Sequence, residues 1–528
     1  MNAAEFARKW SGSQRTERAA AQEHFIDLCH LVGVPTPNEA DPTGERYAFE
    51  KGAEKTDGGD GFADVWKKSH FAWEYKGKRK DLEAAYRQLL QYREALENPP
   101  LLVVCDLDRF EVHTNFTDTA KHVYRFTLAD MVADAKEPLR VLRSVMSSPG
   151  DLKPTKTRSD LTAEAATRFA QLAKSLRDRG NDPHRVAHFL NKLLFCMFAQ
   201  DVGLLPRELV ERLAGNLGRT PKAFGAALRD LFGKMAKGGG SFGVEQIEWF
   251  NGGLFDGDEV LELTSDDIAV VEKASTLDWS NVEPAIFGTL FERGLDPNNR
   301  TSLGAHYTDR ASIEQIVEPV VIAPLRMEFQ QLQQVVEAID LKSKKGVAFT
   351  NARKKAEKLV DAYLDRLGSV RVLDPACGSG NFLYVALQAL KDLEQSVILW
   401  AQFALGVGKL PRVGPQCLLG IEINDYAAEL ARVTIWIGEI QWMLNHGYGF
   451  QRNPVLQALE SISCRDAILD LSNPTIPVEA KWPDAEFIVG NPPFLGTKRL
   501  RTSLGDEYVE KLFALYGDRI PNFSDLCC

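Results

Sequence analysis

Hydrophobic residues follow two spacings along residues 1–150, which indicates that helices and strands are mixed there. Some segments have apolar residues at every third or fourth position, as an amphipathic helix requires, and others are short apolar runs typical of strands. Helices are predicted over 17–32 and 80–96, and strands over 62–66, 71–76 and 101–105. A helix between the last two strands predicts a mixed α/β domain.

Residues 151–300 have almost exclusively helical spacing. A polar segment at 147–159 is expected to link this region to the first one. Helices are predicted over 161–179 and 185–201, and the run 189–198 is apolar on nearly all sides, as a buried helix would be. No catalytic pattern is recognisable in this region, so a helical connector domain is the expectation.

From residue 301 onward, strands and helices alternate in the order of a doubly wound α/β domain. Helices are predicted over 310–335, 352–367, 381–399 and 425–445, and strands over 370–373, 418–423 and 487–489. The expected architecture is therefore an α/β multidomain chain: an α/β domain at 1–150, a helical connector at 151–300 and a Rossmann-like domain at 301–528.

Composition narrows the class of protein. The chain of 528 residues has a formal net charge of −10, which argues against an architectural DNA binder covered in basic patches but leaves room for an enzyme with one basic cleft. The apolar runs are too short for a membrane helix and the N-terminus is polar, so a cytoplasmic protein is expected. The 8 cysteines have no zinc or disulfide spacing.

A glycine-rich turn follows the predicted strand 370–373. It reads Asp374-Pro375-Ala376-Cys377-Gly378-Ser379-Gly380 and leads directly into a helix. Gly378 and Gly380 can adopt positive φ and allow a ligand close to the backbone, and the helix N-terminus can bind a carboxylate. Because ligands of such sheets bind at the carboxyl ends of strands, Asp374, Ala376, Gly378 and Gly380 are candidate cofactor-binding residues.

Two acidic residues lie at the ends of later strands. Glu422 could accept hydrogen bonds from ribose hydroxyls, and Asp466 could accept one from an adenine amine. The glycine-rich turn alone would fit a dinucleotide-binding Rossmann domain equally well. The order of turn, Glu422, Asp466 and the motif described next favours S-adenosyl-L-methionine instead.

The tetrapeptide Asn491-Pro492-Pro493-Phe494 suggests the chemistry. An exocyclic amine is a poor nucleophile because its lone pair is delocalised into the ring. Hydrogen bonds to the Asn491 side-chain oxygen and the Pro492 carbonyl would localise that lone pair, while Pro493 stiffens the turn and Phe494 stacks on the target. In duplex DNA the base must be flipped out to reach such a turn. The pattern predicts an amino-methyltransferase that acts on a base.

A second candidate site lies upstream, at Asp64 and at Glu74 and Lys76 on the next predicted strand. Two carboxylates from adjacent strands can hold Mg²⁺, and a lysine can orient or activate water for phosphodiester hydrolysis. The spacing alone fits a charged edge strand more often than a nuclease. The following helix with Gln88 and an apolar strand favours the nuclease. Glu23 is either a further metal contact or a plain surface acid.

The C-terminal motifs resemble the γ class of N6-adenine DNA methyltransferases. That class has a Gly-x-x-Tyr-Thr motif before the glycine-rich turn, present here as Gly304-Ala305-His306-Tyr307-Thr308. The resemblance implies that Tyr307 and Thr308 flank the methionine end of the cofactor and that double-stranded DNA is the substrate. The order of regions over nearly the whole chain resembles type IIL single-chain restriction–modification enzymes, which join a PD-(D/E)xK nuclease to such a methyltransferase. No protein partner is implied.

The chain departs from that family at its end. The family continues into further strands and a target-recognition domain, whereas this sequence stops at Cys528. A truncated chain unable to methylate or cleave specific DNA is therefore expected. The alternatives are an inactive remnant that binds cofactor or DNA only, and a protein-glutamine methyltransferase, which shares the Asn-Pro-Pro-aromatic turn but lacks the motif at 304–308 and a nuclease region.

Overall fold

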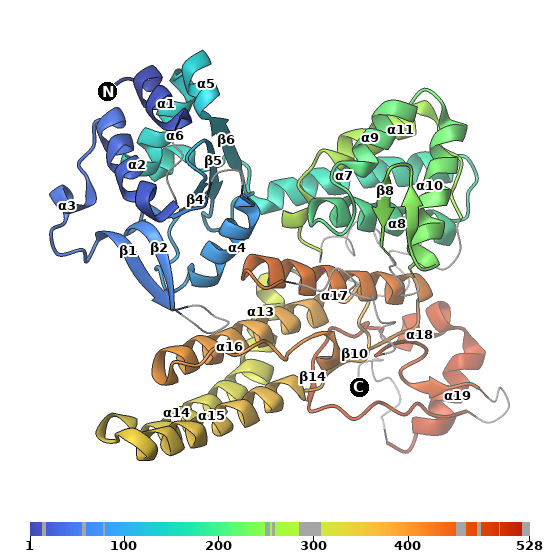
Figure 1. Cartoon of the computed structure of the whole chain (residues 1–528). Helices are drawn as coiled ribbons and strands as arrows, with labels where there is room; N and C mark the ends of the chain where they lie inside the picture. The colour runs from blue at the N-terminus through green and yellow to red at the C-terminus, as the bar shows by residue number, and fades with distance from the viewer. Residues whose placement is uncertain are drawn as a thin grey trace. The chain divides into compact units, whose positions relative to one another are not determined.

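A computed structural model describes residues 1–12, 17–54, 60–77, 80–248, 254–255, 259–284, 308–449, 461–472, 477–495 and 497–519. The chain forms two compact units (Figure 1). Unit 1 consists of Met1–Asp160 with Ile398–Leu410 and Met443–Gly449. Unit 2 consists of Leu161–Val397, Pro411–Trp442 and Phe450–Cys528.

Unit 1 is built on a six-stranded sheet whose strands lie in sequence order. The strands are β1 (Tyr47–Glu54), β2 (Asp60–Lys67), β3 (Phe71–Tyr75), β4 (Leu101–Cys105), β5 (Arg109–Thr114) and β6 (Val123–Thr127). Only β3 and β4 run parallel, and the helix α4 (Leu82–Tyr92) makes the crossover that a parallel pair requires.

Both faces of this sheet are apolar, which explains why every residue of β3 is buried. Phe71, Trp73 and Tyr75 pack on one face against α1 (Ala3–Ser11), α2 (Glu17–Val32) and α6 (Lys136–Ser147). Ala72 packs on the opposite face against α4. The short helices α3 (Pro37–Ala40) and α5 (Leu128–Ala133) complete the unit.

The first part of unit 2 is helical. It consists of α7 (Arg158–Asp178), α8 (Pro183–Asp201), α9 (Leu209–Leu217), α10 (Pro221–Ala236) and α11 (Ser265–Ser275), with a short hairpin of β7 (Gly240–Phe242) and β8 (Glu245–Ile247). Helix α8 is buried almost throughout, as its all-round apolar sequence predicts.

The second part of unit 2 contains a parallel four-stranded sheet in the order β11, β10, β9, β14. These strands are Ile462–Cys464, Leu418–Glu422, Val372–Asp374 and Phe487–Ile488. The crossover helices are α16 (Asn381–Leu405) and α17 (Asp425–Asn445). Upstream lie α13 (Arg310–Val317), the π-helical turn η4 (Glu318–Ile322), α14 (Ala323–Glu337) and α15 (Gly346–Gly368). Downstream lie β12 (Leu469–Asp470), β13 (Val478–Glu479), α18 (Thr497–Leu504) and α19 (Asp506–Tyr516).

The mixed α/β class is confirmed, and so are most of the predicted elements. The polar segment 147–159 is more ordered than a plain linker, because it contains the 3-10 helix Pro149–Leu152 with Leu152 buried, and Thr157 bridges to Thr119. Among the described residues, no helix is long and apolar enough to cross a membrane. The described cysteines are free thiols, and all of them except Cys464 are buried.

Candidate functional site

The carboxyl edge of the sheet in unit 2 gathers the residues that the motifs singled out. Strand β9 ends at Asp374 and the adjacent strand β10 ends at Glu422. On the other side of β9, β14 pairs Ile488 with Leu373, so the chain reaches Asn491 at this same edge. Parallel strands therefore bring the turn at 374–380, Glu422 and the turn at 491–494 to one end of the sheet.

The carboxylate of Glu422 holds the glycine-rich turn. Its Oε2 accepts a hydrogen bond from the Gly378 amide at 2.8 Å, and its Oε1 accepts one from the Asn424 amide at 2.8 Å. Burial raises the pKa of Glu422 above its usual value. A carboxylate has about four acceptor positions, so two remain for a ligand.

The two glycines of the turn have different surroundings. Both have positive φ, +52° at Gly378 and +85° at Gly380, where other residues are strained. A Cβ on Gly380 would lie 3.1 Å from the Ala431 backbone on α17, so Gly380 allows close packing. A Cβ on Gly378 would meet nothing within 4 Å, so Gly378 faces open space that a ligand can enter.

Asp374 lies beneath this edge. It is buried, its Oδ1 accepts a hydrogen bond from the Ala376 amide at 3.0 Å, and burial raises its pKa to about 7. A Cβ on Gly490 would come within 2.4 Å of Asp374 Oδ1. Gly490 is thus a residue that motif reasoning missed. It lets the Asn491 turn approach the glycine-rich turn closely.

Asn491 is exposed and oriented by a distant residue. Its Nδ2 donates a hydrogen bond to Thr308 Oγ1 at 3.0 Å, which directs the amide oxygen elsewhere. Phe494 is 58% exposed, as a stacking platform needs to be, whereas the next residue, Leu495, is buried. Tyr307, the other residue that the resemblance assigned to the cofactor, lies outside the described residues.

Asp466 is more heavily bonded than its predicted role requires. Its Oδ1 accepts hydrogen bonds from the amides of Ile468 (2.7 Å) and Leu469 (3.1 Å), and its Oδ2 accepts one from the Tyr508 hydroxyl at 2.7 Å. Burial and this bond raise the pKa of Tyr508. One of about four acceptor positions on Asp466 remains for a cofactor amine. No sequence signal pointed to Tyr508.

In unit 1 the predicted nuclease residues lie close together. The register of β2 and β3, with Val65 opposite Trp73, puts Asp64 opposite Glu74 if continued by one residue. Asp64 Oδ2 accepts a hydrogen bond from the Tyr75 amide at 2.6 Å. Lys76 Nζ donates to Glu74 Oε1 at 2.8 Å and to Gln88 Oε1 at 3.1 Å, so Gln88 on α4 joins the cluster.

Two carboxylates of this cluster are candidate ligands for a cation. Mg²⁺ keeps several waters and needs only one or two protein carboxylates, which Asp64 and the buried Glu74 can supply. In the part of the chain that the structure describes, no group of three or more His, Cys, Asp or Glu side chains has the arrangement of a metal site. The Glu23 carboxylate is 2.8 Å from Lys9 Nζ, which fits the plain alternative of a surface acid.

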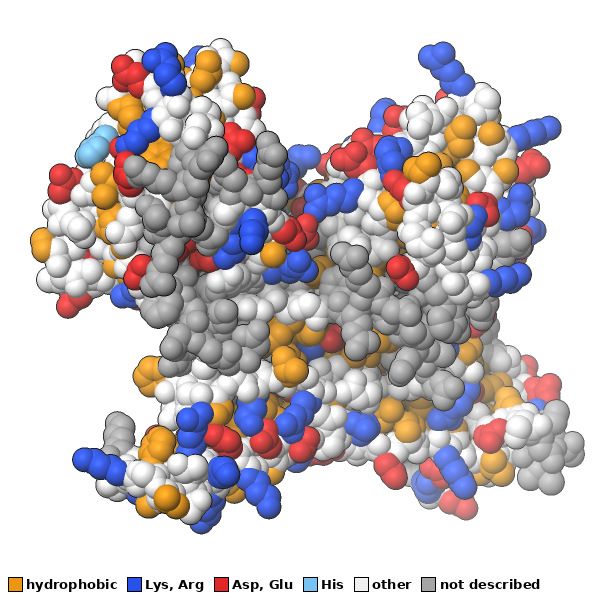
Figure 2. All heavy atoms as spheres, in the orientation of Figure 1, with side chains coloured by type: hydrophobic (Ala, Val, Ile, Leu, Met, Phe, Trp, Pro, Cys, Tyr) orange, Lys and Arg blue, Asp and Glu red, His pale blue; other side chains and the backbone are white. Residues whose placement is uncertain are grey.

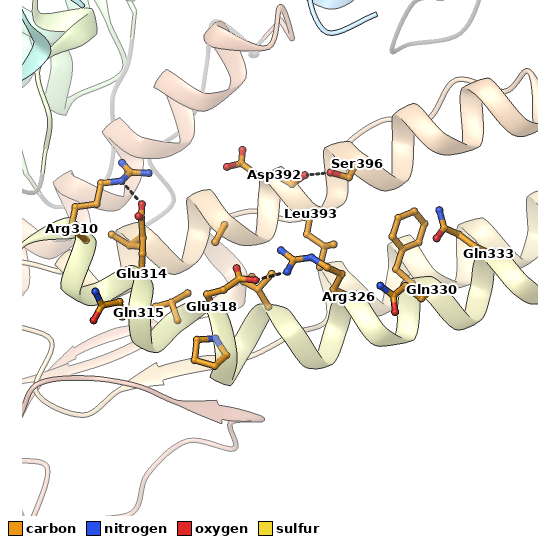
Figure 3. Close-up of a pocket in the computed structure, with 17 residues that line it drawn as sticks. Arg310, Glu314, Gln315, Glu318, Arg326, Gln330, Gln333, Asp392, Leu393 and Ser396 are labelled. Atoms are coloured by element: carbon orange, nitrogen blue, oxygen red, sulfur yellow. Dashed lines mark hydrogen bonds and ion pairs between the residues drawn. The ribbon is translucent and has the colours of Figure 1, made fainter. Parts of the chain in front are cut away.

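A groove of about 870 Å³ lies along α13, η4, α14 and α16 (Figure 3). Four of its charged side chains are paired with one another, Arg310 with Glu314 and Arg326 with Glu318. The fifth, Asp392, accepts a hydrogen bond from Trp442 Nε1 at 2.7 Å. None of the predicted site residues lines it, so the groove is distinct from the sheet edge.

Three family models match the chain one after another. They are the MmeI N-terminal domain at residues 1–179, the MmeI helicase spacer domain at 184–255 and the MmeI DNA-methyltransferase domain at 349–518. The chain belongs to the type IIL restriction–modification family. In this family member the nuclease-like cluster falls within the first match, and Asp374, Glu422 and Asn491 fall within the third.

Individual relatives agree with this assignment. DNA methyltransferase A of Bacillus subtilis is 26% identical over 495 residues, which are 90% of this chain and 52% of that protein. A type II restriction enzyme and methyltransferase of Methanocaldococcus jannaschii is 24% identical over 291 residues, 48% of this chain and 24% of that protein. The solved structure of the type IIL restriction-modification enzyme MmeI in complex with DNA matches with a TM-score of 0.51 and 25% identity over 67% of this chain and 49% of that one. The chain thus spans about half or less of the length of these relatives.

Proposed function

We propose that unit 2 carries an S-adenosyl-L-methionine-dependent methyltransferase that acts on the N6 amine of adenine in DNA. The observation that carries this proposal is the sheet edge where Glu422 holds the glycine-rich turn and Thr308 orients Asn491. The match of residues 349–518 to a DNA-methyltransferase domain supports it.

The residues at this edge fit the cofactor. Gly378 faces open space and Glu422 keeps two acceptor positions, which suit two ribose hydroxyls. Asp466 keeps one position for the adenine amine, and the helix N-terminus after Gly380 suits the methionine carboxylate. When bound, the cofactor supplies an electrophilic methyl group.

The turn at 491–494 would then bind the target adenine. Because Asn491 Nδ2 is engaged with Thr308, Asn491 Oδ1 is left to accept from the adenine amine, together with the Pro492 carbonyl. Those two bonds localise the lone pair and fix the nitrogen in line for attack. Phe494, 58% exposed, offers a face on which a flipped base stacks.

The direct test is methyl transfer from labelled S-adenosyl-L-methionine to mixed-sequence DNA, followed by digestion to nucleosides. This chain is compared with a form extended through its downstream reading frame, and each with its Asn491→Ala variant. In the extended form we expect label in N6-methyladenine, lost in Asn491→Ala while cofactor affinity is retained. Label in methylcytosine or protein glutamine, or no transfer by either form, contradicts the proposal.

A specific observation also favours a second activity in unit 1, a Mg²⁺-dependent DNA endonuclease. Asp64 and Glu74 would hold the metal ion, and Lys76, which bonds both Glu74 and Gln88, would orient the attacking water. With both activities in one chain, the protein would serve restriction–modification or phage defence in the cytoplasm of a bacterial or archaeal cell.

The endonuclease is tested with Lys76→Met, and Lys68→Met serves as the matched control because, among the described residues, Lys68 pairs with the exposed Glu97 alone. Cleavage of supercoiled DNA should require Mg²⁺ and disappear in Lys76→Met but not in the control. Equal cleavage by the two variants would mean that the cluster is a folding element.

A further inference from the structure

The turn between α14 and α15 is strongly basic in an otherwise acidic chain. Residues 341–358, here called the basic hairpin, contain seven cationic side chains and one acidic side chain, Glu357, whereas the whole chain has 63 cationic and 73 acidic residues. The cationic residues are Lys342, Lys344, Lys345, Arg353, Lys354, Lys355 and Lys358. In Figure 2, Lys and Arg side chains gather at the lower left, where Figure 1 places α14 and α15.

The two helices hold this turn in a defined place. The Tyr363 hydroxyl on α15 donates to the Leu325 carbonyl on α14 at 2.6 Å, and the Tyr363 ring stacks on Phe329 with centroids 6.0 Å apart. Lys344 Nζ donates to the carbonyls of Ile339 and Asp340 at the end of α14. The basic hairpin is therefore the turn of a packed helix pair together with the first 13 residues of α15.

Most of this charge is not neutralised within the described residues. Arg353 pairs with Glu357 at 2.9 Å, but Lys345, Lys354, Lys355 and Lys358 are exposed and no described carboxylate lies within ion-pairing distance of them. Lys354 and Lys358 are four residues apart on one helix, a spacing at which like charges repel and destabilise the helix. The helix thus bears an unfavourable charge arrangement that an anionic partner would relieve.

We propose that the basic hairpin binds the phosphate backbone of duplex DNA outside the target base. Duplex DNA carries one negative charge per about 1.7 Å of its axis, so four exposed lysines between the start and the middle of α15 match its charge without reading sequence. This inference rests on the proposed function only in taking DNA as the polyanion that the chain meets.

The hairpin is a surface separate from the methyl-transfer site. The C-terminal end of α15 lies beside the amino ends of the strands, because Arg366 pairs with Glu486 just before β14. The 23 residues of α15 span about 34 Å and the three-residue β9 spans about 10 Å, so Lys345, at the N-terminal end of α15, is at least about 24 Å from the sheet edge. Lys358 lies about 20 Å further along the helix towards the sheet. At about 3.4 Å per base pair, the phosphates that Lys345 contacts are about seven or more base pairs from the target.

The test compares two variants with the same change of charge. The hairpin variant carries Lys345→Gln, Lys354→Gln, Lys355→Gln and Lys358→Gln. The control carries Lys→Gln at four exposed lysines elsewhere in unit 2, namely Lys174, Lys222, Lys237 and Lys273. Affinity for a mixed-sequence duplex is measured against salt concentration for the whole chain and both variants. We expect the slope of log affinity against log salt to fall by about 2–4 in the hairpin variant only, at about 0.9 per lost phosphate contact.

Equal slopes in the two variants would overturn the proposal, as would a wild-type chain that binds no duplex. Sedimentation that shows a dimer lost only in the hairpin variant would assign the surface to a second copy, and binding to vesicles of anionic lipid but not to DNA would assign it to a membrane. If adenine is methylated but the hairpin and control variants have equal salt slopes, only the hairpin proposal is contradicted. A hairpin-specific slope, with no methyl transfer by this chain or by its extended form, removes the proposed function alone.

Discussion

The Thr308 hydroxyl accepts a hydrogen bond from the Asn491 side-chain amide at 3.0 Å, although the two residues are 183 positions apart. This bond determines which atom of the Asn491 side-chain amide can bind a ligand. The nitrogen is engaged with Thr308, so the oxygen is left for a donor such as an exocyclic amine. We therefore propose that Thr308 positions Asn491 for methyl transfer, in addition to the cofactor contact that the family resemblance implies.

Replacing Thr308 with valine should slow methyl transfer more than it weakens cofactor binding. The isosteric side chain cannot accept the Asn491 bond, and the loss of one positioning hydrogen bond of about 0.5–1.5 kcal/mol leaves the amide free to rotate. Single-turnover transfer and calorimetric titration with S-adenosyl-L-methionine separate the two effects. Thr308→Ser keeps the hydroxyl and should restore the rate. If both variants lose cofactor affinity equally, Thr308 acts on the cofactor alone.

Glu422→Gln should weaken cofactor binding by about 1.5–3 kcal/mol, the range for hydrogen bonds to a charged acceptor. The change keeps the size of the side chain but removes the charge that accepts from the Gly378 amide and that, on the proposed function, would accept from the ribose hydroxyls. Asp484→Asn, at an exposed acid of the same unit, is the control for net charge. An affinity for S-adenosyl-L-methionine that is the same in the two variants would remove Glu422 from the cofactor site.

Gly490→Ala should lower the free energy of unfolding by about 1–3 kcal/mol, because the added Cβ would lie 2.4 Å from Asp374 Oδ1. The cost should shrink in an Asp374→Ala background, where that oxygen is absent, and a double-mutant cycle by denaturant unfolding measures the difference. Gly233→Ala adds a Cβ that meets nothing within 4 Å and should not destabilise the chain. Additive effects of the changes at 490 and 374 would show that the two turns do not touch.

Asp374 should make the stability of unit 2 depend on pH. Burial raises its folded-state pKa to about 7 from the ordinary 3.8, so the folded state favours the protonated acid. The contribution of Asp374 to the free energy of unfolding is fully present below pH 3.8, and it is lost as the pH rises through 7. The loss is up to about 4 kcal/mol. Asp374→Asn cannot ionise. The variant should therefore gain stability relative to wild type between pH 5.5 and 8 in thermal unfolding, and a constant difference would contradict the shifted pKa.

Much of the fold could be predicted because its elements have strong local patterns. The helix Asp425–Asn445 and the strand Leu101–Cys105 were predicted to the residue. Strand β1 was missed because this edge strand carries polar residues that weaken its apolar pattern. Strand β5 was missed although Phe110 and Val112 alternate with polar residues, which was an available signal.

The motif residues at the sheet edge could be recognised because each follows a strand, and parallel strands bring their carboxyl ends together. The contacts that orient them could not be predicted. The bonds of Thr308 to Asn491 and of Tyr508 to Asp466 join segments that are far apart in sequence, and they depend on how helices and turns pack in three dimensions. No spacing or composition rule encodes such pairs.

The position of the bound cofactor tests the proposal that the carboxyl edge of the sheet in unit 2 binds S-adenosyl-L-methionine. The whole chain is irradiated with ultraviolet light in the presence of labelled S-adenosyl-L-methionine, and the labelled peptides are identified by mass spectrometry. We expect label in peptides that contain 374–380, 418–424 or 487–495, reduced by an excess of unlabelled cofactor and in Glu422→Gln. Label confined to peptides of the groove along α13, α14 and α16, or spread over the chain without competition, would contradict it.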